Sequence, residues 1–297
     1  MTHGAAEDVG LAGLAFARSQ NELARFNRIR LTPTTDEPVE RSANGRLLRL
    51  ENEFVETARR WIRPLCADIP PTADAFVEWF EALSLDGPGQ GDPLFPWLAA
   101  LANWDQMKWF LSQEAAGEAG FDDLVALTQV KMPERAKLEM ARNYWDEMGR
   151  GTANGMHGPM LARLIEHFKI VPQLETTLPE CLALGNVMMA LACSRRYAFQ
   201  SVGALGVIEM TAPTRVSFVD AGLRRLGVPA HFRTYFALHA TLDVKHSRAW
   251  NREVIHTLVA EDGRRAAAIG EGALLRLWCG QRCFERYRAH FAGAAWT

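Results

Sequence analysis

The amino-acid sequence predicts an all-α protein. From Leu47 onward, apolar residues recur at three- and four-residue spacing, the period of one helix face, in one segment after another. Stretches that end and start helices, such as LSLDGPGQGDP, TTLPE and LGVPAH, separate these segments. No alternating apolar and polar stretch bounded by turn dipeptides stands out, and no repeat of fixed period is found. We therefore expect a helical bundle rather than a sheet or a solenoid.

The periodic segments cover the chain from residue 46 to its end. In order they are LLRLENEFVETARRWI, FPWLAALANWDQMKWFLSQEAAGEA, ERAKLEMARNYWDEMGRG, LARLIEHFK, VMMALACSRRYAFQSVGALGVIEM, RTYFALHATLDVKHSRAWNREVIHTLV and GALLRLWCGQRCFERYRAHF. Residues 1–45 differ, because one amphipathic stretch, Leu11 to Phe26, is followed by the polar, proline-containing LTPTTDEPVERSANG. We predict a partly flexible N-terminal arm over residues 1–45 and one helical domain over residues 46–297.

Composition and charge exclude several classes of partner. Hydrophobic residues make up 48% and charged residues 23% of the chain, as in ordinary globular proteins, and the formal net charge is -2. Neither nucleic acid nor an anionic membrane surface is therefore an expected partner. Glu7 and Asp8 stand where a secretion signal carries positive charge, and no apolar run approaches the roughly 18 residues of a membrane span. We expect a cytoplasmic protein.

The cysteines predict neither a disulfide framework nor a zinc ribbon. The chain has five of them, an odd number, and no CxxC pair. Cys279 and Cys283 are four residues apart, which is about one helical turn. We interpret them as two thiols on one helix face.

Two histidines and an aspartate give the strongest local signal for chemistry. In FALHATLDVKHSRAW, His239 is followed by Asp243 after four residues and by His246 after seven. At about 100° per residue, these steps return to within about 40° of the starting direction, so all three side chains leave one face of one helix. Imidazole and carboxylate groups in this arrangement are suited to ligating a metal ion.

One helix cannot complete such a site, so facing helices must supply further carboxylates or imidazoles. Glu209 is the sole charge in the apolar run SVGALGVIEM, where an unpartnered charge would be costly. Glu147 and His157 flank a glycine-rich passage, which can interrupt a helix and let two residues ten apart reach one centre. Glu114 lies near the end of an aromatic-rich segment.

Each of these four residues also has an ordinary structural interpretation. Glu209 fits a buried salt bridge, and Glu147 fits a surface charge beside Asp146. His157 fits a loop histidine, and Glu114 fits a solvated residue in the last turn of its helix. Taken together with the histidine-rich helix, they favour the mixed nitrogen and oxygen shell that bridged iron or manganese pairs use in helical bundles.

A ferritin-like bundle is the competing arrangement, and it needs a Glu-x-x-His motif from each of two helices. The sequence holds only one copy, Glu253 and His256. This pair lies about 20 Å along the same helix from His239, at about 1.5 Å per residue, and cannot join the same centre. We interpret it as an exposed pair one helical turn apart.

The candidate residues resemble a known family, the heme-oxygenase-like diiron oxidases and oxygenases, often described as iron-containing redox enzymes. The matching elements are FLSQE, ARNYWDEMGRG with the histidine that follows it, the apolar helix that contains VIEM, and HxxxDxxH. They lie between about residues 95 and 260, and the first hundred residues contribute no motif. The resemblance implies a heme-oxygenase-like bundle of about seven core helices, with a diiron site in place of heme.

The resemblance also implies a reaction and a set of ligands. In such enzymes the reduced diiron centre binds O2 and forms a peroxo-bridged intermediate. This intermediate oxidises a small molecule by N-oxygenation, terminal-alkene formation or oxidative C–C cleavage, acting on an amine, an amino acid or a fatty acid. The implied metal ligands are Glu114, Glu147, His157, Glu209, His239, Asp243 and His246. Of these, Glu147 and Glu209 are the candidates for a bridging carboxylate, and Glu114 is an additional, mobile ligand.

Two iron ions are thus the expected cofactor, with O2 as the cosubstrate. Manganese, or a mixed manganese and iron pair, is compatible with the same donors, because shells rich in oxygen discriminate poorly among these ions. The expected partners are a small-molecule substrate and an external electron donor.

Two other functions fit parts of the sequence. A metal-free heme-oxygenase-like enzyme of thiaminase type would need a nucleophilic cysteine, for which Cys193 is the best candidate, and a quinone-cofactor oxidase is the other metal-free possibility. Both leave the His, Asp and Glu set unexplained. A non-catalytic metal-binding module could use the aromatic segment Gly272–Trp296 to form a homodimer. For the enzyme, Tyr144, Trp145 and Met210 are candidates to line the pocket.

Overall fold

The protein is built from helices joined by short loops, as a computed structural model shows for residues 3–35, 41–117 and 120–293. Within these ranges there is no strand, only an isolated bridge between Met148 and Met156. None of the helices there is both long and apolar enough to cross a membrane. The α-helices are α1 (His3–Leu31), α2 (Arg41–Ile62), α3 (Ala73–Asp86), α4 (Leu94–Ala100), α5 (Trp104–Gly117), α6 (Phe121–Thr128), α7 (Glu134–Glu147), α8 (His157–His167), α9 (Pro179–Cys193), α10 (Ala198–Arg225), α11 (Thr234–Ala249), α12 (His256–Glu261) and α13 (Arg265–His290). The all-α prediction is confirmed.

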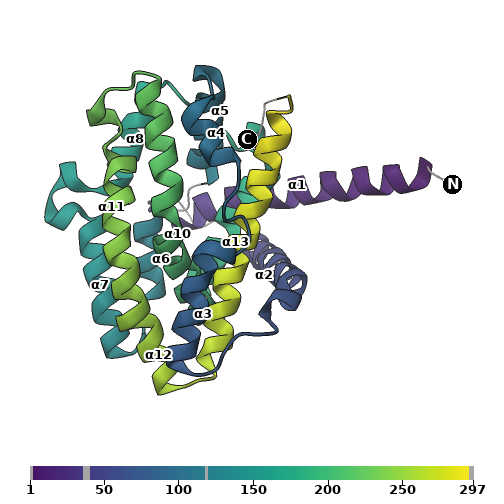
Figure 1. Ribbon diagram of the computed structural model, residues 1–297. Helices are drawn as coiled ribbons and strands as arrows, with labels where there is room; N and C mark the ends of the chain where they lie inside the picture. The colour runs from purple at the N-terminus through teal and green to yellow at the C-terminus, as the bar shows by residue number, and fades with distance from the viewer. Residues whose placement is uncertain (1–2, 36–40, 118–119, 294–297) are drawn as a thin grey trace.

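Helix α10 is the centre of the bundle and packs against α13, α11 and α4 (Figure 1). Its contact with α13 requires glycine on both helices. A Cβ atom at Gly203 would lie 1.8 Å from the carbonyl oxygen of Ile269, and one at Gly272 would lie 1.8 Å from that of Gln200. The two backbones therefore approach too closely for any side chain at these positions.

The N-terminal segment contains one long helix, α1, which includes the predicted amphipathic stretch from Leu11 to Phe26. The second half of α1 is docked, because Leu23 is fully buried in the core and Asn27 donates a hydrogen bond to Asn186 of α9 at 2.9 Å. The first half extends away from the bundle (Figure 1). Part of the polar stretch that we expected after α1, residues 36–40, lies outside the described residues.

A segment of π-helix, Trp250–Ile255, joins α11 to α12 directly after the histidine-rich turns. Trp250 is almost fully buried, and its indole donates a hydrogen bond to the carbonyl of Val202 in α10 at 3.2 Å. A Cβ atom at Gly206 would lie 2.7 Å from the same indole. The wide turn thus places Trp250 in contact with α10 and fixes α11 beside the helix that carries Glu209.

Candidate metal centre

Four helices, α7, α8, α10 and α11, bring histidine and glutamate side chains together inside the bundle. The donor atoms form two groups, and in each group all donor atoms lie within 4.8 Å of one another. The first group is Glu147, His157 and His239, and the second is Glu147, Glu209 and His246. Glu147 belongs to both groups. The structure therefore gathers these five predicted residues from four separate helices.

The glycine-rich passage between α7 and α8 brings Glu147 and His157 together. Glu147 is the last residue of α7 and His157 the first of α8, and the bridge between Met148 and Met156 closes the loop between them. Gly149 has φ +57°, and a Cβ atom there would lie 2.2 Å from the backbone of Gly155, so the loop requires glycine at this point. As a result, Glu147 Oε2 lies 2.8 Å from His157 Nδ1.

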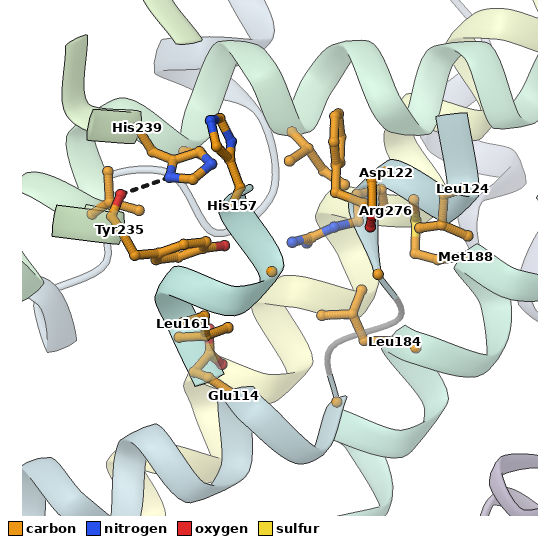
Figure 2. A pocket seen from close by; sticks show the side chains of 18 of the residues that line it. Glu114, Asp122, Leu124, His157, Leu161, Leu184, Met188, Tyr235, His239 and Arg276 are labelled. Carbon is orange, nitrogen blue, oxygen red and sulfur yellow. Dashed lines mark hydrogen bonds between the residues drawn. The ribbon is translucent and has the colours of Figure 1, made fainter. Parts of the chain in front are cut away.

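The two histidines of α11 each have one ring nitrogen held by a neighbour. His239 Nδ1 lies 2.6 Å from the carbonyl oxygen of Tyr235, which accepts a hydrogen bond from it (Figure 2). His246 Nε2 lies 3.0 Å from Asp146, while its Nδ1 lies 3.6 Å from Glu209. Such outer partners fix the orientation of a ring and leave its other nitrogen available as a ligand.

Two polar residues of α7 that the sequence analysis did not select also position this cluster. Asn143 is buried and donates a hydrogen bond to Glu209 Oε1 at 2.5 Å. Asp146 contacts His246 and also accepts a hydrogen bond from Arg150 at 2.6 Å. A helix-period signal was available for Asn143, which lies one turn before Glu147, but no pattern in the sequence pointed to Asp146.

The cluster concentrates acidic groups in a buried place. Glu147, Glu209 and Asp243 are each less than 5% exposed. Burial, together with the charges of Glu209 and Glu147, raises the pKa of Asp243 to about 9. Burial alone would lower the pKa of His246, but its contacts with Glu209 and Asp146 raise it to about 9, whereas burial lowers the pKa of His239. The raised pKa keeps Asp243 protonated at neutral pH, which is the cost of gathering three buried carboxyl groups with one protonated His246. A cation held by these groups would favour their ionised forms.

Unpaired polar atoms in the same cluster test whether it fits a metal. Asp243 Oδ1 is buried and has no hydrogen-bond partner in the described part of the chain. His157 Nδ1 and His246 Nδ1 are also buried; each faces a glutamate oxygen, at 2.8 and 3.6 Å, without forming a hydrogen bond of good geometry. Leaving such atoms unpaired is costly, and most buried polar atoms in proteins avoid it. A metal ion would use their lone pairs, since imidazole nitrogen and carboxylate oxygen are ordinary ligands of iron and manganese. The residues therefore fit a metal centre.

A cavity of about 180 Å³ adjoins the cluster. Glu147, His157, Glu209, His239 and Asp243 all contribute to its wall, so the donors face the space in which a small molecule could bind. Figure 2 shows His157, His239 and Tyr235 on one side of this cavity and Leu124 and Met188 on the other. His246 is not among the described lining residues of the cavity.

Two of the predicted ligands lie outside both donor groups. Asp243 is close enough to Glu147 and Glu209 for their charges to raise its pKa. It does not belong to either of the two donor groups found among the described residues. Glu114 lies on the cavity wall, where it accepts a hydrogen bond from the hydroxyl of Tyr287 at 2.6 Å. To ligate a metal, Glu114 would have to leave Tyr287.

One family model matches the chain over residues 108–281, which is more than half of it, and its description is iron-containing redox enzyme. The chain belongs to this family. The matched range includes every predicted site residue from Glu114 to His246 and agrees with the heme-oxygenase-like resemblance. A comparison with curated proteins gives no match. As a member of the iron-containing redox enzymes, the chain is an oxidoreductase.

Several other candidates lie away from the site of this iron-containing redox enzyme. Tyr144, Trp145 and Met210 are not among the described lining residues of the cavity, and the Trp145 ring is 54% exposed and covers Gly151. Tyr144 and Met210 instead pack against the hydrophobic core. Cys193 is also absent from the lining, and burial raises the pKa of its thiol, which disfavours a nucleophilic thiolate.

Proposed function

We propose that the chain is a non-heme diiron oxidase or oxygenase that uses O2 to oxidise a small molecule bound in the adjoining cavity. The observation that carries the proposal is the membership of Glu147 in both donor groups. A carboxylate shared in this way is suited to bridging two adjacent ions, as in other helical bundles with paired metals. One ion would be held by His157 and His239 with Glu147, and the second by Glu209 and His246 with Glu147.

Asp243 is proposed as a further ligand, since its Oδ1 is buried and unpaired in the described residues. The same oxygen-rich donors would accept manganese or a mixed pair, and the family description favours iron. The metal supplies the reactivity toward O2 and the transfer of electrons. Where the substrate does not provide all the electrons that O2 requires, an external donor has to supply the rest.

The protein's own residues set the geometry and the environment of this chemistry. The carbonyl of Tyr235 and the carboxylate of Asp146 orient the two imidazoles of α11, and Asn143 orients the carboxylate of Glu209. Apolar side chains on the cavity wall, among them Leu161 and Leu184, limit the entry of water.

Glu114 enters the proposal as a mobile carboxylate. Its hydrogen bond from Tyr287 holds it on the wall of the cavity, apart from the ligand cluster. Breaking this bond would free Glu114 to act as a ligand or to accept a proton from the substrate. Tyr287 is thus proposed as the residue that holds Glu114 away from the donor cluster until Glu114 is needed as a ligand or a base.

The test is the iron content of protein reconstituted with ferrous iron without oxygen, measured by metal analysis and Mössbauer spectroscopy. We expect about two irons per chain, as in other paired-metal bundles, and loss of iron in His239→Ala and Glu209→Ala. His256→Ala is the matched control, because this exposed histidine contacts Asp74 instead of the cluster. A wild-type protein that binds no iron, or variants that bind it unchanged, would overturn the proposal. Oxygen consumption by the loaded protein then tests the reaction.

A further inference from the structure

A lone arginine lies in the cavity next to the ligand cluster. Arg276 of α13 lines the cavity, and Figure 2 shows its guanidinium group directed toward the side where His157 and His239 lie. Within residues 3–35, 41–117 and 120–293, no carboxylate forms an ion pair with it. The other arginines of α13 all have such a partner: Arg265 pairs with Glu261, Arg282 with Glu285, Arg286 with Glu180 and Arg288 with Asp92.

A second guanidinium group lies near Arg276 but is not among the described lining residues of the cavity. Arg215 of α10 donates a hydrogen bond to the Thr211 hydroxyl at 2.9 Å. Burial, together with the charge of Arg276, lowers the pKa of Arg215 to about 9, and the charge of Glu114 only partly offsets this. Tyr287 already donates a hydrogen bond to Glu114, so this carboxylate is engaged; Asp122 is a further carboxylate on the cavity wall.

We propose that Arg276 binds the carboxylate group of the substrate and holds the molecule with its other end at the ligand cluster. The planar guanidinium group offers two parallel N–H donors, which match the two oxygens of a carboxylate. The carboxylate site rests on the place of Arg276 in the cavity wall and on its lack of an ion pair among the described residues, whereas the placement of the reacting end rests on the proposed diiron function. The substrate class is therefore a small organic monocarboxylic acid.

The cavity sets the size and the charge of this acid. Its volume of about 180 Å³ exceeds only slightly the roughly 150 Å³ cavity that can hold benzene. The wall between the two ends is formed partly by apolar side chains, including Leu161, Leu184 and Ile208. The lining also includes Asp122, which would repel a second negative charge on the ligand, so a monoanion fits better than a phosphate ester or a diacid.

Binding to the metal-free protein tests the site without reference to the iron chemistry. Isothermal titration and thermal unfolding would compare three acids with their amides: hexanoate with hexanamide, phenylacetate with phenylacetamide, and L-leucine with L-leucinamide. We expect at least one acid to bind and to raise Tm while its amide does not. Arg276→Met should weaken this binding roughly tenfold or more, because the charge-assisted pair is lost. Arg276→Lys should keep part of the affinity as a single point charge.

The matched control is Arg282→Met, which removes a 48%-exposed arginine from the same helix. This variant should bind the acids as the wild type does. A preference for L-leucine over hexanoate would identify an amino-acid site, and the reverse preference would identify a site for simple carboxylic acids.

The proposal is overturned if no acid binds more tightly than its amide, or if Arg276→Met binds the acids as tightly as wild type. Circular dichroism and the Tm of the variants show whether they are folded, and Arg276→Lys keeps the test valid if Arg276→Met is not. Iron content, measured separately, distinguishes the two proposals. A variant that loads iron normally but has lost acid binding supports the carboxylate site, whereas a wild type that binds acids but no iron removes only the diiron function.

Discussion

The Glu147–His157 pair and the Glu253–His256 pair combine the same two residue types in opposite environments. Glu147 and His157 are each 5% exposed at the side chain, lie 2.8 Å apart and belong to the donor cluster. Glu253 instead pairs with Arg135 at 2.7 Å, and the 41%-exposed His256 pairs with Asp74 at 2.9 Å. The comparison teaches that spacing along a helix does not make a metal site. What distinguishes the candidate site is the burial of several donor atoms within 4.8 Å of one another.

The largest expected effect comes from removing the shared carboxylate. Glu147→Ala should abolish the binding of both irons of the proposed diiron centre, because the residue belongs to both donor groups. Glu253→Ala should leave the iron content unchanged. Metal analysis after anaerobic loading measures both. Retention of one full iron by Glu147→Ala would show that the residue serves a single ion and does not bridge.

A change in the loop between Glu147 and His157 should also be severe. Gly149→Ala places a side chain at φ +57° and 2.2 Å from the backbone of Gly155, so we expect a loss of about 2 kcal/mol or more in the free energy of unfolding. Gly158→Ala is the control, since a Cβ atom there meets nothing within 4 Å. Denaturant unfolding of the metal-free proteins gives the difference. Equal stability of the two variants would contradict this account of the loop.

A moderate effect is expected from the residue that orients His246. Asp146→Ala should weaken iron binding roughly 10- to 100-fold, because the outer partner of an imidazole ligand is lost. The comparison variant is Glu139→Ala on the same helix, whose carboxylate pairs with Arg142 and not with the cluster. Competition with a calibrated chelator measures the affinity. If Glu139→Ala weakens binding as much as Asp146→Ala does, the hydrogen bond to His246 is not the cause.

The smallest effect belongs to the exposed pair and depends on pH. The hydrogen bond from Arg135 lowers the pKa of Glu253 below its ordinary value of 4.5. A lowered folded-state pKa adds stability above the ordinary pKa and loses it as pH falls through the lowered value. Glu253→Gln should therefore be slightly less stable than wild type at neutral pH and should match it under strongly acidic conditions. If the difference in stability between Glu253→Gln and wild type grew as the pH fell, the pKa of Glu253 would not be lowered in the folded state.

Most residues of the donor cluster could be predicted from the sequence, because each stands in a recognisable local pattern. His239 and His246 share a helix face by their spacing, and Glu209 is conspicuous as the only charge in an apolar run. The loop that joins Glu147 to His157 was indicated by its glycines. Each of these signals lies within one helix or one loop, where spacing determines direction.

The other features of the site depend on how the helices pack against one another, which the spacing of residues along one helix does not determine. Asp146 was taken for a neighbour of a surface charge, yet it contacts His246 from another helix. Trp145 was a candidate for the cavity and is instead exposed. No sequence pattern distinguishes Arg276 from the other arginines of its helix. Only the structure shows that the others form ion pairs and that Arg276 lines the cavity. The all-α fold itself needed only the helical period.

The shared glutamate has a consequence for the folding of the chain. The donor groups join residues 147 and 157 to residue 209 and to residues 239 and 246, three segments that are far apart along the chain. A metal ion bound there would link these three segments and so close the long loops between them. Because the unfolded chain has no preformed site, this binding would stabilise the folded state. The entropic cost of closing a loop grows only slowly with its length, so the long separations along the chain do not prevent it. The proposed metal centre would therefore also hold α7, α8, α10 and α11 together, and treatment with a chelator would lower the stability of the bundle as well as stop the reaction.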